Sequence, residues 1–409
     1  MPHAAQLQNP QVVALSRVNT LDQQGEAIAV YGQTDLDLTS KLQLTLGLRY
    51  TSKTSRHARA YSRRASVPRK QILPCPACWA STLGAVAHDF GPDQLERREN
   101  KVTYSASLQW AATDQLNAYI SSSSGFKAGG FSSVAFGSSP QEAEFGSEAV
   151  ISYEVGAKAK LFNGTTQLSA AYFFTEIDDL QVAQFTGGGS FIVQNAAEAK
   201  AQGLELDARF QLGKNLGVNV TGAYTDFEFT SFPRAGCTAQ QLTAFRQSAY
   251  DQGTALLLDG NPANDALGAN LQLFGSLRGI QDCSAAGINN LRGRTGEQVP
   301  ELTGQLAVDY HLEFGADFAI DTVAEIVWND RQFRQLDLDP LAESGSFAKT
   351  NLSLALYRNG TPWTLMLMGR NIFDKKTFSY VNDTPFVSGA RQQIVDKPRT
   401  FKLQLQYDF

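Results

Sequence analysis

The stretch Leu42–Thr51, LQLTLGLRYT, alternates apolar and polar residues without interruption. Its even-numbered positions are leucine or tyrosine, and its odd-numbered positions are glutamine, threonine, glycine or arginine. Successive side chains of a β-strand point to opposite faces, so this stretch predicts a strand with one apolar and one polar face. The same alternation recurs at Leu204–Leu212 (LELDARFQL) and at Phe401–Phe409 (FKLQLQYDF), the last residues of the chain.

Period two is found in thirteen segments, which we predict to be strands. They are residues 26–38, 42–52, 101–111, 115–127, 150–162, 165–178, 199–212, 216–229, 300–312, 318–330, 346–357, 363–372 and 399–409. Their connections alternate between short turns, such as 39–41 and 112–114, and long loops, such as 53–100 and 230–299. This alternation predicts an all-β, antiparallel, up-and-down sheet with short turns at one end and long loops at the other.

The length of the predicted strands indicates where the sheet lies. Strands of soluble β-sandwiches average about five or six residues, whereas these run to about ten or more. A strand of about ten residues, tilted by ~40°, spans roughly 25 Å, which is the height of the apolar band of an outer-membrane barrel. The pattern therefore favours a transmembrane β-barrel over a soluble β-fold. Its lumen is expected to be lined by Gln33, Asp35, Asp37, Arg49, Glu154, Lys158, Glu205, Asp207, Arg209, Asp321 and Glu325.

The composition excludes several other classes of protein. Lys and Arg number 35 against 40 Asp and Glu, a net charge of −5, which argues against a chain built to bind nucleic acid. No apolar run approaches the ~18 residues that a membrane helix requires. The hydrophobic share of 43% is too high for a disordered chain. The four histidines do not assemble with a serine and an acid into a catalytic triad, so we expect neither an enzyme nor a metal site.

Four motifs follow one another along the chain. They are AYISSSSGFKAGGF (Ala118–Phe131), YEVGAKAKLFNGTTQLSAAYFF (Tyr153–Phe174), NAAEAKAQGLEL (Asn195–Leu206) and GRNIFDKK (Gly369–Lys376). Together they resemble the C-terminal part of the β-barrel of TonB-dependent outer-membrane receptors. The terminal Phe409 resembles the C-terminal aromatic residue that outer-membrane proteins present to the barrel assembly machinery.

The resemblance implies a division of the chain. Barrels of this family have about 22 strands, so residues 25–409 are expected to be the C-terminal portion of such a barrel, with about thirteen strands. Residues 1–24 show no clear strand. No stretch resembles the family's N-terminal plug or its TonB-contacting box, and no secretory leader is recognised. We therefore expect a truncated or mis-started form of a longer receptor.

The same resemblance implies a function in the outer membrane of a Gram-negative bacterium. The expected activity is TonB-energised uptake of a scarce solute, most often a ferric siderophore in this family. The expected partners are outer-membrane lipid, lipopolysaccharide, the barrel assembly machinery and, through the missing N-terminal part, the TonB complex. A passive porin-like pore and a structural or adhesin barrel are the alternatives.

Two groups of residues are candidates for ligand binding at the end with the long loops. Residues 53–70, KTSRHARAYSRRASVPRK, contain no acid, and Arg56, Arg59, Arg63 and Arg64 in this stretch are suited to hold an anionic ligand. Contact with lipopolysaccharide or simple solvation is the favoured alternative. Phe126, Lys127 and Phe131 form the second group, for which a structural role at the turn is the favoured alternative.

All four cysteines lie in predicted loops. Cys75 and Cys78 have the spacing of a local loop disulfide, since no second cysteine or histidine pair for zinc stands nearby. Cys237 and Cys283 lie in the longest loop, where a bridge would restrict the unfolded chain. We therefore expect the pairs 75–78 and 237–283.

Overall fold

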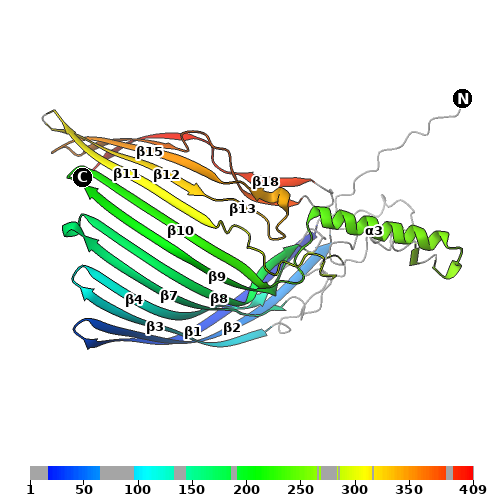
Figure 1. Cartoon of the computed structure of the whole chain (residues 1–409). Coiled ribbons are helices and arrows are strands. Elements are labelled where there is room, and N and C mark those ends of the chain that lie inside the picture. Colours follow the sequence, from blue (N-terminus) through cyan, green and yellow to red (C-terminus); the bar gives the residue numbers. More distant parts are fainter. Residues whose placement is uncertain are drawn as a thin grey trace, which may run out of the picture.

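The computed structural model describes residues 17–64, 96–132, 144–185, 191–264, 267–268, 283, 286–315, 317–383 and 390–408. In this part of the chain, thirteen strands form one curved antiparallel sheet in which each strand pairs with the next one along the chain (Figure 1). They are β1 (Arg17–Thr39), β2 (Leu42–Arg64), β3 (Glu96–Thr113), β4 (Leu116–Lys127), β7 (Glu148–Leu161), β8 (Thr166–Phe185), β9 (Phe191–Leu212), β10 (Leu216–Ser231), β11 (Leu302–Phe314), β12 (Phe318–Asn329), β15 (Phe347–Arg358), β16 (Trp363–Arg370) and β19 (Thr400–Tyr407). Each predicted segment corresponds to one of these strands, so the predicted architecture is confirmed.

The register of the sheet separates an apolar face from a polar one. Leu206 lies opposite Ala170 and Gly222, whereas the next residue, Asp207, lies opposite Ser169 and Thr221. Leu206 is 50% exposed. Such a continuous apolar face is rare on a soluble protein, so its solvent must be hydrocarbon.

Four strands extend well beyond the predicted segments. β2 continues to Arg64, and β8 and β9 reach Phe185 and Phe191, so residues 53–64 of the expected loop 53–100 and most of the expected loop 179–198 are strand. β1 begins at Arg17, which corrects the expectation that residues 1–24 hold no clear strand. These extensions lack apolar alternation in the sequence because strand beyond the bilayer needs no lipid-facing side chains. Val182 of β8 and Ala197 of β9 are instead buried in a hydrophobic cluster at this end of the sheet.

The sheet has two edges in the described residues. β1 pairs only with β2, and β19 pairs only with β16. At the end with short turns, Trp363 of β16 and Tyr407 of β19 pack edge to face with their ring centroids 4.7 Å apart. Aromatic residues at this level are typical of the interfacial girdle of a membrane barrel.

The helix α3 (Ala239–Leu258) projects from the opposite end of the sheet, as Figure 1 shows. Its first turn is fixed by a capping box, in which Thr238 Oγ1 accepts from the Gln241 amide and the Gln241 side chain accepts from the Thr238 amide. Among the described residues, no helix combines the length and apolar character needed to cross a membrane.

Candidate functional site

Three excursions at the end of the sheet that carries the long loops join into one layer, which we call the loop layer. It comprises the described residues of 232–301, 330–346 and 371–399. Its secondary structure is α3 and two short hairpins, β13 (Gln332–Phe333) with β14 (Glu343–Ser344), and β17 (Phe378–Asp383) with β18 (Arg391–Val395). Backbone hydrogen bonds link the excursions, from the Gln298 amide to Phe333 O at 2.8 Å and from the Val381 amide to Arg334 O at 3.4 Å.

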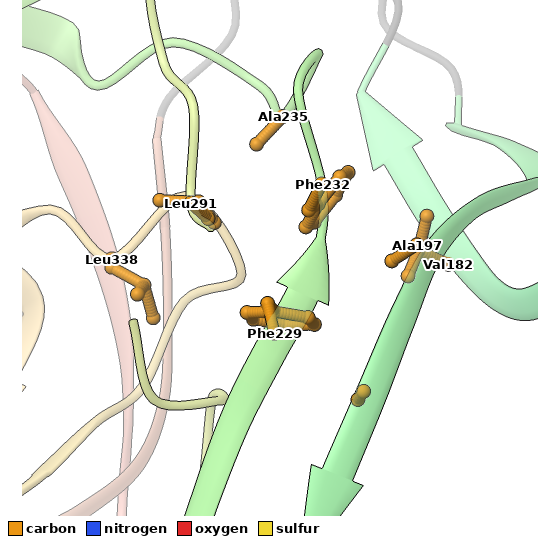
Figure 2. Packing of buried hydrophobic residues seen from close by; sticks show 8 residues of the cluster. Val182, Ala197, Phe229, Phe232, Ala235, Leu291 and Leu338 are labelled. Carbon is orange, nitrogen blue, oxygen red and sulfur yellow. The ribbon is translucent and has the colours of Figure 1, made fainter. Parts of the chain in front are cut away.

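The loop layer has a hydrophobic core, in contrast to the sheet below it. Phe232 is fully buried, and Leu291 and Leu338 are nearly so (Figure 2). The core continues into the sheet through Phe229 at the end of β10, whose ring lies 5.2 Å from that of Phe232. The excursions are therefore anchored to the top of the strands by ordinary apolar packing.

A disulfide closes the largest excursion. Cys237 and Cys283, the predicted pair, are bonded with their Cα atoms 6.3 Å apart, and Cys283 is fully buried. Asn289 lies near this bridge and donates to Gly236 O at 2.6 Å and to Asp337 O at 2.9 Å. It thus connects the disulfide-closed excursion to the β13–β14 hairpin.

A buried network of charges connects the two hairpins. Arg391 of β18 forms an ion pair with Asp339, which has no exposed surface, and its Nε lies 3.4 Å from Asp383. The Gln335 amide bridges the carboxylates of Asp337 and Asp383, with both distances 3.1 Å. Three carboxylates thus share one guanidinium, and the hairpins depend on each other for charge balance.

The titration of these groups follows from their surroundings. Burial raises the pKa of Asp337 to about 7, and the nearby Asp383 and Asp339 act in the same direction. Burial also acts to raise the pKa of Asp396, but hydrogen bonds from Thr377 and Lys349 outweigh it and lower that pKa. The loop layer therefore contains one carboxyl group that titrates near neutral pH.

The Gly-Phe-Lys-Ala-Gly-Gly-Phe motif, residues 125–131, runs from the end of β4 into the short strand β5, which pairs with β6. Arg97 of β3 binds Glu99 at 2.7 Å and Glu144 of β6 (Glu144–Phe145) at 2.5 Å, and the buried Glu99 accepts from the Gly129 amide. A Cβ at Gly129 would lie 2.3 Å from Phe145 O, so only glycine fits here. The motif therefore allows the backbone at Gly129 to lie directly against the backbone at Phe145.

The residues of this motif predicted to bind ligand lie in different surroundings. Phe131, on β5 (Gly130–Phe131), is 5% exposed and serves as a core residue. Phe126 is partly buried and Lys127 is exposed, both at the end of β4. Of the three, Lys127 is the most accessible to a solute.

The basic residues predicted in a loop belong instead to strand β2. Arg56 is exposed, and its Nε lies 3.5 Å from Glu96 of β3, so the acid that its own loop lacks comes from the neighbouring strand. In the backbone register Arg59, Arg63 and Arg64 lie opposite Asp22, Val18 and Arg17. Cys75, Cys78 and Phe409 lie outside the described residues.

A hollow of about 530 Å³ lies on the polar face of the sheet and extends from β4 to β12. Its charged lining consists of Glu154, Lys158, Glu205 and Asp207, all of which are predicted lumen residues. The Tyr119 hydroxyl donates to Glu154 at 2.5 Å, and its ring covers Gly156, where a Cβ would lie 2.6 Å from it. Three carboxylates against one lysine make this part of the wall acidic.

The sequence interpretation missed the loop layer. Thr238 and Gln241 have the spacing of a capping box and signal the start of α3. The network of Asp337, Asp339, Asp383 and Arg391 has no local signature, because its members come from two separate hairpins. In the described part of the chain, no group of three or more His, Cys, Asp or Glu residues is arranged to hold a metal ion.

Comparisons with known proteins agree with this architecture. The sequence profile of the family described as "TonB dependent receptor-like, beta-barrel" matches residues 4–372. The pesticin receptor of Yersinia enterocolitica is 28% identical over 147 residues, which are 36% of this chain and 21% of that protein. The pesticin receptor of Yersinia pestis is 27% identical over 147 residues, with the same coverage.

Solved structures show the same fold. The ferric yersiniabactin uptake receptor FyuA from Yersinia pestis superposes with a TM-score of 0.66 at 18% identity, covering 96% of this chain and 47% of FyuA. The siderophore receptor PiuA from Acinetobacter baumannii gives 0.60 at 17% identity, covering 95% of this chain and 44% of PiuA. The chain thus spans less than half the length of these structures. The relatives are receptors and not enzymes, as the sequence predicts, and the match over residues 4–372 shows that the chain belongs to the family of TonB-dependent receptor β-barrels.

Proposed function

We propose that the protein is an outer-membrane receptor that takes up a ferric siderophore with energy supplied through TonB. The observation that carries the proposal is the loop layer, a folded and disulfide-closed surface at one end of a membrane barrel wall. The outer membrane has no ATP, so a receptor must bind its solute tightly outside and release it by an external force. Relatives named for ferric yersiniabactin uptake and for siderophore binding support this class of solute.

We propose further that other strands pair with the two edges of the sheet. At membrane depth every backbone N–H and C=O must be paired, and β1 and β19 each present an edge in the described residues. The 409 residues then function as one part of a larger barrel. Contact with TonB belongs to residues beyond this wall, whereas lipid and lipopolysaccharide contact its apolar face and Phe409 engages the assembly machinery.

Iron uptake in cells tests the proposed function. The chain is expressed together with the further strands and the TonB-contacting residues that this proposal requires, in a Gram-negative strain that lacks its own ferric siderophore receptors, with and without TonB. Radioactive iron is supplied as a panel of ferric siderophores. We expect accumulation from at least one siderophore only when TonB is present, and surface binding in both strains because binding needs no energy. TonB-independent uptake, or a steady conductance in planar bilayers, would instead identify a passive pore.

A structural variant serves as a control for that experiment. Phe232→Ala removes the centre of the loop-layer core and leaves the strands unchanged. We expect this variant to reach the outer membrane but to lose siderophore binding. Unchanged binding would show that the loop layer does not form the receptor surface.

A further inference from the structure

A second hollow, of about 390 Å³, is lined by five neighbouring strands of the wall, β2, β3, β4, β7 and β8. Nearly all of its surface is apolar, in contrast to the acidic hollow described above. The residues that shape it include Ala106, Ser122, Tyr153, Val155, Tyr172 and Phe174. We call this hollow the outer groove.

The register of the sheet places the outer groove on the face that meets lipid. Tyr172 lies two residues from Ala170, which pairs with the lipid-facing Leu206, so its side chain points to the same face. Tyr172 lies opposite Val155, and Val155 lies opposite Ile120. Val155 and Ile120 are both exposed. The groove is therefore part of the face whose solvent is hydrocarbon.

Two small residues in one row across the strands create the hollow. Ala106 of β3 lies opposite Ser122 of β4, and Ser122 lies opposite Tyr153 of β7. The Ser122 hydroxyl lies 3.0 Å from the Tyr104 hydroxyl, so this polar group is paired within the protein. A hollow beside large rings loses van der Waals contacts unless something fills it. In this position the available filling is a hydrocarbon chain.

One end of the groove reaches the polar boundary of the apolar face. Phe174 at this end lies opposite Gln202, which accepts a hydrogen bond from the Tyr172 hydroxyl. Two residues farther along β8, on the same face, Glu176 lies opposite Lys200. Because β8 runs from a short turn toward Phe185, this boundary belongs to the end with the long loops. The groove thus opens where the lipid headgroups of that leaflet lie.

We propose that the outer groove holds one acyl chain of a lipopolysaccharide molecule. In a Gram-negative outer membrane the leaflet on the side of the long loops consists mainly of this lipid. Phospholipids carry similar chains but lie mainly in the other leaflet. The inference rests on the outer-membrane placement in the proposed function and is independent of the solute, because the groove faces away from the lumen.

Variants that fill the groove test this assignment. The protein is produced as in the uptake experiment and purified from outer membranes in mild detergent, and native mass spectrometry identifies the lipid that it retains. Ala106→Phe places a ring in the groove, and Ala106→Leu fills it less. Ala324→Phe is the matched control, because Ala324 is exposed on the same face of β12, opposite Val308 and Leu352 and outside the groove. Circular dichroism checks that each variant keeps the sheet.

We expect the unaltered protein and Ala324→Phe to retain one lipopolysaccharide molecule. Ala106→Phe should retain less by about five-fold or more, with Ala106→Leu between them, because affinity for a chain scales with the apolar surface that it buries. Equal retention of lipopolysaccharide by Ala106→Phe and the unaltered protein overturns the assignment. Retention of phospholipid in its place, or of no lipid, by the unaltered protein overturns it as well.

Uptake of iron separates this inference from the proposed function. Ala106→Phe should take up ferric siderophore as the unaltered protein does, since Ala106 lies on the lipid side of the wall. Absence of uptake by every variant, with lipopolysaccharide still retained by the unaltered protein, contradicts the proposed uptake and leaves the groove assignment standing. Uptake without retained lipopolysaccharide does the reverse.

Discussion

The barrel wall and the loop layer use opposite rules for their side chains. In the wall, large apolar residues such as Leu403 are exposed, at 68%, and charged residues face the inside. In the loop layer, Phe232 and Leu291 are buried and form a conventional core. The wall owes its stability to backbone ladders surrounded by lipid, whereas the layer depends on packing, one disulfide and a buried charge network. The same change in a side chain should therefore have different effects in the two regions.

The largest effect is expected from truncation of the loop-layer core. Phe232→Ala should destabilise the layer by about 3–5 kcal/mol, because it removes a fully buried ring and leaves a cavity. Leu403→Ala, on the lipid face of β19, should cost much less. Limited proteolysis reports on the layer and circular dichroism on the wall. A larger effect for Leu403→Ala would contradict the contrast between the regions.

Loss of the disulfide should affect the layer alone. Replacing both Cys237 and Cys283 by serine should cost about 3–4 kcal/mol, since the bridge closes a loop with a sequence separation of 46. The measurement is urea unfolding of the layer, followed by limited proteolysis with and without reductant. Non-reducing peptide mapping gives the control and also tests the predicted link between Cys75 and Cys78. Free thiols at 237 and 283 would refute this pairing.

An arginine introduced on each face of the wall tests which face lies against lipid. Leu206→Arg puts a cation toward lipid and should cost about 2–4 kcal/mol near the middle of the bilayer. Thr221→Arg places the same charge on the polar face, opposite Asp207, and should cost little. Unfolding in lipid vesicles measures both variants. Equal costs would mean that the assigned faces are wrong.

The stability of the loop layer should depend on pH. The pKa of Asp337 is about 7 in the folded layer against an ordinary 3.8, so folded protein holds a proton that the unfolded chain releases. The free energy of unfolding of the layer should therefore fall as pH rises from about 4 to about 7, by about 1–4 kcal/mol, and then level off. Asp337→Asn should abolish this fall in unfolding experiments at several pH values.

Asp330 supplies a control of opposite sign for that experiment. A hydrogen bond from Ser346 and the Arg331 amide lower the pKa of Asp330. Its contribution is present above the unfolded pKa and is lost as pH falls, so Asp330→Asn should weaken the layer at neutral pH and leave the Asp337 transition in place. A pH response unchanged by Asp337→Asn would assign the titration to another group.

The smallest effect on stability is expected from adding a methyl group at a glycine of the wall. Gly156→Ala brings a methyl group against the Tyr119 ring and should cost about 1–3 kcal/mol. Combining it with Tyr119→Ala should remove most of that additional cost, because the clash disappears. Urea unfolding of the two single variants and the double variant gives the coupling energy. Strictly additive costs would show that the ring does not cover this glycine.

The sequence predicted the wall well because the wall obeys a local rule. Each strand must present apolar residues to lipid at every second position. Each segment of the sequence meets that requirement by itself. The extensions of β1, β2, β8 and β9 were missed for the same reason, since strand above the bilayer carries no such pattern. Of the predicted binding residues, Arg56 proved to be paired with Glu96, and Phe131 to be buried.

Alternation by itself determined the strands, their order and the two faces of the sheet, because each side chain responds to the solvent on its own side. Only the tertiary structure decided that the excursions form a layer with a core and that Asp339 and Arg391 meet from two hairpins. Those contacts join residues about 50 positions apart, as Asp339 and Arg391 show. No periodic pattern in the sequence predicts these contacts, because they depend on how separate loops pack together in space.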